Sequence, residues 1–137
     1  YNLEKNATIR IREKEGTYTL TIKSPGQDAF IEESTSLTYD EFKDFLNHGI
    51  TNIDSLLDKH VYFMVSLTTI RVTMPYKNGL ICIDKSHYLK RVDYEIEYET
   101  SHPKHKLDLE DFLSNHHIAK RPISGKRFRA LNENKKR

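Results

Sequence analysis

Two segments of the chain carry side chains suited to binding phosphate and metal ions. In the first, Arg10 and Arg12 alternate with isoleucines. In the second, Glu95 and Glu97 belong to a longer alternation of carboxylates with apolar and aromatic residues. Arginine binds phosphate oxygens bidentately, and carboxylates two residues apart on a strand can share a hard cation such as Mg²⁺ or Mn²⁺. Together the two segments predict binding of a polyanion with a divalent metal.

Alternation with a period of two is typical of a β-strand, so each segment presents its charges on one face. Residues 19–23 and 69–73 show the same pattern and add a lysine and an arginine to a shared polar surface. If these faces point to water, they are ordinary solvated strand faces. If they are enclosed, the like charges need opposite charges among them, because burying unpaired charge is costly. Strand parity then places the following residues in the enclosed interior: Arg10, Arg12, Lys23, Arg71, Asp84, Glu95 and Glu97.

The composition is that of a globular chain with one domain, residues 1–137. Its formal net charge of +2 is too small to indicate nucleic-acid binding by bulk electrostatics. A lone Cys82 excludes an internal disulfide framework and agrees with a reducing compartment. No apolar run approaches the roughly 20 residues that a membrane-spanning helix needs, and no signal peptide begins the sequence. The sequence therefore predicts a cytoplasmic protein that contacts neither membrane nor nucleic acid.

Turn and cap signals place the strands and helices. Gly16 predicts the turn of a first hairpin, and Asn78-Gly79 predicts a second. Thr38 and Glu41 form a capping box that starts a helix, which Gly49 ends. In chain order, we expect strands over residues 7–13, 18–23 and 30–34, helices over 38–49 and 53–59, extended chain over 61–76, strands over 80–84 and 92–99, a helix around 109–113 and a final strand near 126–131.

A barrel accommodates antiparallel strands that have one polar and one apolar face: the polar faces line the lumen, and helices cover the apolar outside. The amphipathic helices provide such a cover. We therefore predict an α+β fold, an antiparallel β-barrel or tunnel with a charged polar lumen and helices packed on its outside.

An ordered set of short motifs resembles a known family. It comprises residues 7–13, Thr-x-Lys-x-Pro at 21–25, the isolated Arg71, Ile83-Asp84 followed by Tyr88, the carboxylate block at 93–99, and Ser124-Gly125-Lys126 with Arg129. No single motif is specific, but the ordered set resembles the CYTH domain of the triphosphate tunnel metalloenzyme superfamily. Within that superfamily it is most similar to the YjbK-like proteins of Gram-positive bacteria. The resemblance covers nearly the whole chain.

The resemblance implies a tunnel of eight antiparallel strands that binds a triphosphate through basic residues and a divalent cation, Mg²⁺ or Mn²⁺, through acidic ones. Asp84 and Lys126 match positions implied to be catalytic, Asp84 by holding a second metal or positioning the attacking water. An acidic residue on the third strand is also implied; parity leaves Glu32 or Glu33 open, and we assign Glu33. The implied phosphate-binding residues are Arg10, Arg12, Lys23, Arg71, Lys126 and Arg129, and the implied metal ligands are Glu95, Glu97, Asp84 and Glu33.

One part of the family pattern is not found. The family begins with a strand of alternating glutamates that ends in lysine, whereas this chain opens at Tyr1-Asn2-Leu3-Glu4. Either the chain as given lacks this first segment, or the protein has lost part of its metal site and one wall of its tunnel. We favour the first alternative, because an unclosed barrel would leave an unpaired strand edge.

The same tunnel is compatible with three functions. The first, which we favour, is a divalent-metal-dependent triphosphatase that hydrolyses the terminal phosphate of inorganic triphosphate or of a small organic triphosphate. The second is a nucleotidyl cyclase of the adenylate cyclase type, in which a ribose hydroxyl replaces water as the nucleophile. The third is a protein that binds a triphosphate or polyphosphate without turning it over. The sequence does not separate these functions, and it leaves a homodimer open.

Overall fold

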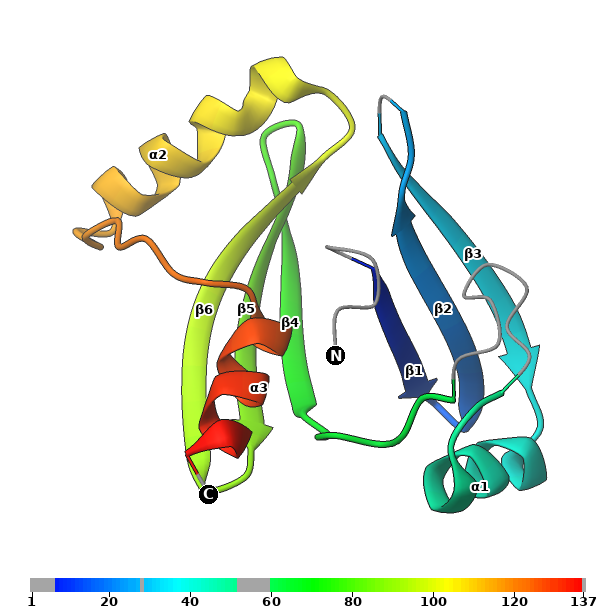
Figure 1. Cartoon of the computed structure of the whole chain (residues 1–137). Helices are drawn as coiled ribbons and strands as arrows, with labels where there is room; N and C mark the ends of the chain where they lie inside the picture. The colour runs from blue at the N-terminus through cyan, green and yellow to red at the C-terminus, as the bar shows by residue number, and fades with distance from the viewer. Residues whose placement is uncertain (1–6, 28, 52–59, 137) are drawn as a thin grey trace. The chain divides into compact units, whose positions relative to one another are not determined.

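The computed structural model of the chain (Figure 1) describes residues 7–27, 29–51 and 60–136. Residues 1–63 and 64–137 form two compact units, and each is described by itself. The first contains β1 (Thr8–Lys14), β2 (Thr17–Pro25), β3 (Phe30–Leu37) and α1 (Tyr39–His48). The second contains β4 (Thr68–Tyr76), β5 (Gly79–Tyr88), β6 (Arg91–Thr100), the 3₁₀ helix η2 (Pro103–Lys106), α2 (Leu107–Asn115) and α3 (Lys126–Lys135).

The strands in the described residues form two three-stranded antiparallel sheets, ordered β1-β2-β3 and β4-β5-β6. This arrangement confirms the predicted α+β class and the antiparallel pairing. Closure of the strands into one barrel stays a prediction. Across the described ranges, no helix is long and apolar enough to cross a membrane.

The first hairpin forms as predicted because both residues of its loop adopt a left-handed backbone. Glu15 and Gly16 have φ values of 52° and 77°, the pair of positive angles that a two-residue type I′ turn requires. Lys14 and Thr17 pair at the end of the ladder. The Gly16 N–H also donates to the Glu13 carboxylate at 3.0 Å. The turn therefore fixes the register of β1 against β2.

Helix α1 begins and ends at the predicted signals. The Glu41 N–H donates to Thr38 Oγ1 at 3.1 Å, and the Thr38 N–H donates to the Glu41 carboxylate at 3.0 Å, which is a complete capping box. Gly49 follows the helix with φ 81° and donates its N–H to a carbonyl of the last turn. Tyr18 of β2 stacks on Phe42, with ring centroids 4.6 Å apart. Aromatic contacts therefore hold α1 against the first sheet.

The chain between α1 and β4 is regular only in part. The extended segment predicted over residues 61–76 joins a sheet from Thr68 onward, and Val61 makes an isolated antiparallel bridge to Ile50. The helix predicted over residues 53–59 lies outside the described residues.

The loop of the second hairpin lies one residue earlier than predicted. Its loop residues are Lys77, with φ 48°, and Asn78, and Tyr76 pairs with Gly79. A Cβ on Gly79 would lie 2.4 Å from the Glu99 carbonyl oxygen. The Asn-Gly signal located the hairpin, but this glycine permits the close approach of β5 and β6 and does not supply a left-handed turn residue.

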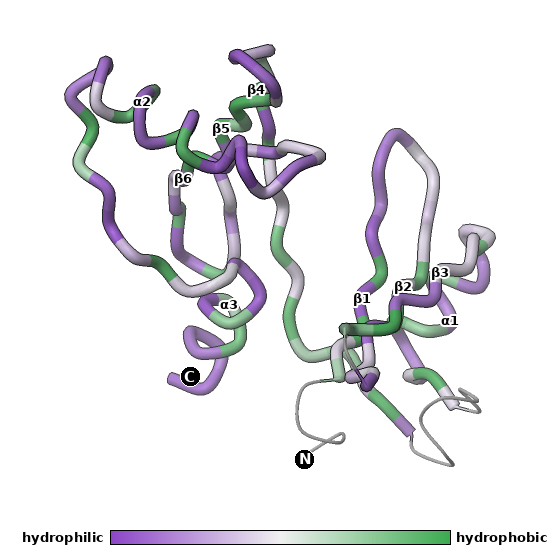
Figure 2. The backbone as a smooth tube through the Cα atoms, turned by 90° about the horizontal axis from the view of Figure 1, so that it is seen from above, coloured by the Kyte–Doolittle hydropathy of each residue, from purple (hydrophilic) through white to green (hydrophobic). Residues whose placement is uncertain are grey.

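Alternation divides the sheet β4-β5-β6 into an apolar and a polar face, and the mixed colouring along these strands is visible in Figure 2. On the apolar face, Ile81 is fully buried and packs against Phe112 and Leu113 of α2. On the same face, the Tyr98 hydroxyl donates to the Tyr76 carbonyl at 3.0 Å. Burying each large apolar side chain contributes roughly 1.5–3 kcal/mol. This core fastens α2 to the sheet and confirms the predicted apolar stripe of that helix.

The predicted final strand, residues 126–131, is wrong, because this segment belongs to helix α3. Residues 126–135 contain no β-branched residue and are rich in residues that favour helix. In a strand, Lys126 and Arg129 would point to opposite faces, whereas in a helix they are neighbours. Helix α3 directs both toward the polar face of the sheet and fully buries Ala130. Since α2 covers the apolar face, the two helices lie on opposite faces of this sheet.

Replacing Ile81 with Ala should lower the free energy of unfolding by about 2–5 kcal/mol, because the change leaves a cavity under α2. Ile70 provides a matched control, since it lies on the same face of the sheet and is 59% exposed. Ile70→Ala should cost about 1 kcal/mol or less. Urea unfolding followed by circular dichroism measures both, and equal losses would contradict the placement of α2 over Ile81.

Candidate functional site

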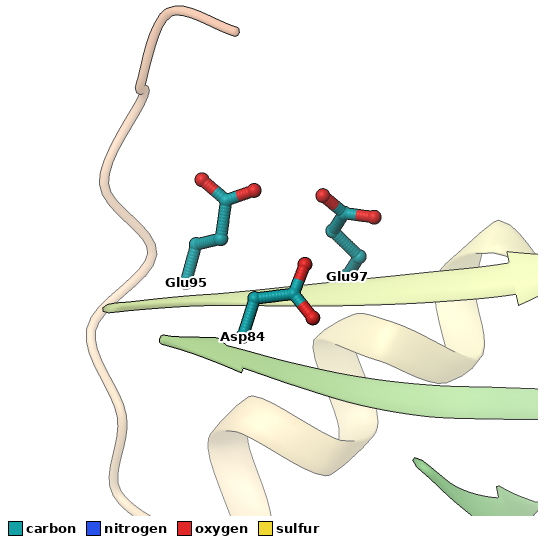
Figure 3. Close-up of side chains that lie close together, drawn as sticks. All are labelled: Asp84, Glu95 and Glu97. Atoms are coloured by element: carbon teal, nitrogen blue, oxygen red, sulfur yellow. The ribbon is translucent and has the colours of Figure 1, made fainter. Parts of the chain in front are cut away.

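Three carboxylates converge on the polar face of the second sheet. Asp84 of β5 pairs across the ladder with Glu95 of β6, and Glu97 lies two residues further along β6 on the same face. One oxygen atom from each lies within 4.8 Å of the others, and Figure 3 shows the three side chains projecting from the same side of the strands. Asp84 is fully buried, whereas Glu95 and Glu97 are half-buried. Asp84, Glu95 and Glu97 are called the carboxylate cluster below.

Lys126, the first residue of α3, contacts all three members of the carboxylate cluster. Its Nζ lies 2.6 Å from Asp84 Oδ2 and 2.5 Å from Glu97 Oε1. It also forms an ion pair with Glu95 Oε1. The ammonium therefore sits where the three carboxylates meet.

Arg71 of β4 holds the cluster from the neighbouring strand. It pairs with Asp84 in the register, and its guanidinium binds that carboxylate bidentately, Nε to Oδ1 at 2.6 Å and Nη2 to Oδ2 at 2.7 Å. The same guanidinium donates to Glu97 at 2.8 Å and to Glu99 at 2.6 Å. Bidentate, charge-assisted hydrogen bonds are strong and directional, so Arg71 fixes the orientation of Asp84.

Arg129 lies three residues after Lys126 on α3 and contacts the other end of the cluster. Its Nη2 donates to Glu95 Oε2 at 2.6 Å, and its Nε donates to Asp93 Oδ2 at 2.9 Å. The Tyr88 hydroxyl donates to the same Asp93 oxygen. Asp93 and Tyr88 therefore orient the guanidinium of Arg129 toward Glu95.

The basic residues predicted in the first unit share one face of its own sheet. Arg10 pairs with Thr21, which is two residues before Lys23, and Arg12 follows Arg10 by two. Burial lowers the pKa of Arg10, and the nearby charge of Arg12 adds to this effect. The three cations thus form one cationic face, as strand parity predicted.

The acidic residue of β3 on this cationic face is Glu32. The register pairs Glu32 with Lys23, and it pairs Glu33 with the buried Ile22 on the other face. The predicted placement of Glu33 among the charged residues is therefore wrong by one position. Parity alone could not decide between neighbours, because the answer depends on how β3 is aligned with β2.

Comparison with known families agrees with these features. The family model of the CYTH domain matches residues 2–124 of the chain. The chain belongs to the CYTH domain family. This match confirms the family resemblance seen in the sequence motifs, and it extends over both units of this CYTH protein.

Two relatives cover most of the CYTH chain. A protein of Bacillus subtilis (strain 168) named "Putative triphosphatase YjbK" is 30% identical over 142 residues, which cover 97% of this chain and 74% of the relative. A crystal structure of a "putative adenylate cyclase" from Bacillus halodurans is similar over 90% of this chain and 71% of that chain, with a TM-score of 0.73 and 29% identity. The predicted similarity to YjbK-like proteins is therefore confirmed.

The donor set of this CYTH carboxylate cluster fits a hard divalent cation. Its three candidate ligands are all carboxylates, and Mg²⁺ and Mn²⁺ prefer oxygen ligands. The ion pairs described above join five carboxylates to three cations. Among these side chains of the described residues, negative charge therefore exceeds positive charge by two. One divalent cation would balance that excess. The carboxylates are Asp84, Asp93, Glu95, Glu97 and Glu99, and the cations are Arg71, Lys126 and Arg129.

Hydrogen bonds and ion pairs keep Asp84 and Glu95 ionised. Hydrogen bonds from Arg71 hold the pKa of Asp84 below its ordinary value of 3.8 against the opposing effect of burial, and Lys126 adds to them. Burial alone would raise the pKa of Glu95, but its ion pairs with Lys126 and Arg129 lower it. Burial alone would lower the pKa of Lys126, but its bonds to the cluster raise it. Asp84 and Glu95 are therefore anionic and Lys126 cationic near neutral pH.

Six of the predicted site residues come together in the second unit of the CYTH chain. Sequence reasoning did not assign roles to Asp93, Glu99 and Tyr88, which also contact this group. The signal for Asp93 and Glu99 was present, because the alternation that identified the glutamates of β6 extends to both of them. The six are Arg71, Asp84, Glu95, Glu97, Lys126 and Arg129, whereas Arg10, Arg12 and Lys23 lie in the first unit.

The lowered pKa of Asp84 predicts how stability depends on pH. Because the folded-state pKa lies below the ordinary value of 3.8, ionised Asp84 stabilises the fold above that value. This stabilisation is lost as the pH falls through the folded-state pKa. Asp84→Asn should therefore be less stable than the original chain at pH 7, and the difference should shrink below about pH 4. Urea unfolding from pH 7 to pH 2 measures it; a difference that stays constant would contradict the ion-pair network.

Proposed function

We propose that this CYTH protein is a divalent-metal-dependent triphosphatase that hydrolyses the terminal phosphate of inorganic triphosphate or of a small organic triphosphate. The observation that carries the proposal is the carboxylate cluster, in direct contact with Arg71, Lys126 and Arg129. Candidate metal ligands and candidate phosphate-binding cations are thus side by side. The 30% identity to the protein named "Putative triphosphatase YjbK" supports the choice of reaction.

In this proposal, Asp84, Glu95 and Glu97 hold Mg²⁺ or Mn²⁺. A bound ion of this kind neutralises phosphate charge and polarises the oxygens attached to it. The protein's part is to keep the carboxylates ionised and in place, which the hydrogen bonds from Arg71 do for Asp84. Asp84 is buried between two cations and has a lowered pKa, so it suits holding a metal or positioning water better than accepting a proton.

The arginines and lysines bind the phosphates that do not react and stabilise the charge of the transition state. In the second unit, the residues proposed to bind phosphate are Lys126, Arg71 and Arg129. Arg10, Arg12 and Lys23 would add to it, with Glu32 as the acidic residue of β3. The family resemblance implies that both sets line one closed tunnel, and we include that closure in the proposal.

The reaction is an in-line displacement. Water attacks the terminal phosphorus and forms a new P–O bond, while the bond from that phosphorus to its bridging oxygen breaks. The water proton passes to solvent, and inorganic triphosphate yields orthophosphate and pyrophosphate. Positioning and electrostatic stabilisation supply most of the catalysis in such transfers.

A nucleotidyl cyclase is the second candidate. It is favoured by the structural similarity to the Bacillus halodurans protein described as a "putative adenylate cyclase". In that reaction a ribose hydroxyl of the nucleotide, in place of water, attacks the α-phosphorus, and the bond from that phosphorus to its bridging oxygen breaks to release pyrophosphate. The same carboxylates and cations would serve both reactions, so the products distinguish them.

Product analysis tests the two candidates directly. The protein is incubated with inorganic triphosphate and with ATP, each with and without Mg²⁺ or Mn²⁺, and phosphate, pyrophosphate and cyclic nucleotide are measured. Metal-dependent phosphate release supports the triphosphatase. Cyclic nucleotide with pyrophosphate supports the cyclase, and saturable triphosphate binding without any product supports a binding protein.

Replacing Glu95 or Glu97 with Gln should lower metal-dependent phosphate release by about 100-fold or more, because an amide supplies no negative charge to the metal. Glu110→Gln is the matched control, since Glu110 is an exposed glutamate on α2. Phosphate release at saturating triphosphate measures the effect. If both cluster variants retain activity, Glu95 and Glu97 are not ligands of the metal.

Replacing Arg71 with Ala should lower turnover by about 100-fold or more, as is typical of a lost electrostatic stabiliser. Arg10→Ala should have an effect of similar size if the cationic face of the first sheet binds phosphate. Lys135→Ala is the control, because Lys135 is exposed at the end of α3. Circular dichroism checks that each variant is folded; if all three variants retain full activity, the phosphate-binding assignment is wrong.

A further inference from the structure

The position of Lys126 raises a question about how a metal ion enters the carboxylate cluster. Its Nζ lies 2.6 Å from Asp84, 2.5 Å from Glu97 and also pairs with Glu95. These are the same three side chains that offer oxygens for a metal. A divalent ion needs oxygens at roughly 2.0–2.2 Å, so it and the ammonium cannot occupy this place together.

Apart from the carboxylates of the sheet, no acidic side chain in the described residues forms an ion pair with the first turn of α3. Lys126, Arg127 and Arg129 place three cations there, and the turn contains no acidic residue. Positive charge is unfavourable at a helix N-terminus because of the helix dipole. The N-cap, Gly125, offers no side-chain hydrogen bond. The carboxylates on the sheet are therefore what holds this cationic turn in place.

The rest of α3 has attachments of its own. Ala130 is fully buried, Glu133 pairs with Arg91 at 2.8 Å, and the Asn134 side chain donates to the Met64 carbonyl at 3.3 Å. The helix can thus stay on the sheet when its first turn loosens. A lysine side chain can leave the carboxylates more readily than an arginine side chain, since its compact charge sits on a flexible stem.

We propose that Lys126 is a tethered competitor of the divalent cation: its ammonium occupies the metal position in the metal-free protein, and metal binding displaces it and loosens the first turn of α3, which Arg129 still holds to Asp93. The inference rests on the proposed function, because it takes the carboxylate cluster to be the metal site. It also explains how Lys126 can serve the phosphates, since a displaced ammonium is free to bind a phosphate oxygen.

Metal binding without any triphosphate tests the competition. The full 137-residue chain, Lys126→Met and Lys135→Met are titrated with Mn²⁺, and free Mn²⁺ is measured by electron paramagnetic resonance. Lys126→Met should bind Mn²⁺ about tenfold more tightly or better, within the usual range of coupling between sites. Lys135→Met, a change of the same type on the same helix, should match the original chain.

The outcomes separate the two proposals. If the original chain binds Mn²⁺ and Lys126→Met binds it equally or more weakly, Lys126 is not a competitor, although the metal site stands. If none of the proteins binds Mn²⁺, both the metal site and the competition are wrong.

A measurement on the unaltered chain remains decisive if Lys126→Met does not fold. The Arg129 N–H donates to the Gly125 carbonyl at 3.1 Å and so reports on the first turn of α3. Hydrogen exchange of this amide, followed by NMR, should become several-fold faster when Mg²⁺ is added, while the amide of Lys136 at the other end serves as the reference. Unchanged exchange at saturating Mg²⁺ would overturn the loosening of the first turn of α3.

Discussion

The buried charge of Asp84 is the constraint on which the second unit depends. The Asp84 side chain is fully buried. Its carboxylate must be paired with cations, because removing one partner of a buried ion pair costs about 3–5 kcal/mol. Arg71 from the adjacent strand and Lys126 from α3 supply the pairing. This requirement explains why a helix that begins with a run of cations lies over the polar face of the sheet. It also ties the hairpin of β4 and β5 to α3, which lies far from it in sequence.

The same strands serve both the core and the site. Along β6, Ile96 points to the apolar face that packs on α2, while its neighbours Glu95 and Glu97 point to the opposite face. Because successive side chains of a strand alternate in direction, fastening one face fixes the other. The carboxylates are therefore held by a paired backbone with a packed core behind it, which is the rigidity that a metal site needs.

Charge balance connects the fold to the proposed chemistry. In the second unit the cations that suit phosphate binding are bonded to carboxylates, and the carboxylates exceed them by two charges. Such a group does not attract an anion by itself. A divalent cation removes the excess and leaves the ammonium and guanidinium groups available to phosphate. Metal and triphosphate therefore suit this site as a pair better than either does alone.

The sequence by itself determined the features that depend on neighbours along the chain. These are the first hairpin, the capping box and ending glycine of α1, the apolar stripe of α2, and the alternation that puts the glutamates of β6 on one face. Only the tertiary structure decided which neighbour of a pair faces the cations, Glu32 or Glu33, and that residues 126–135 form a helix. The physical reason is that local patterns set backbone angles and side-chain direction, whereas strand register and the pairing of a buried charge depend on residues distant in sequence.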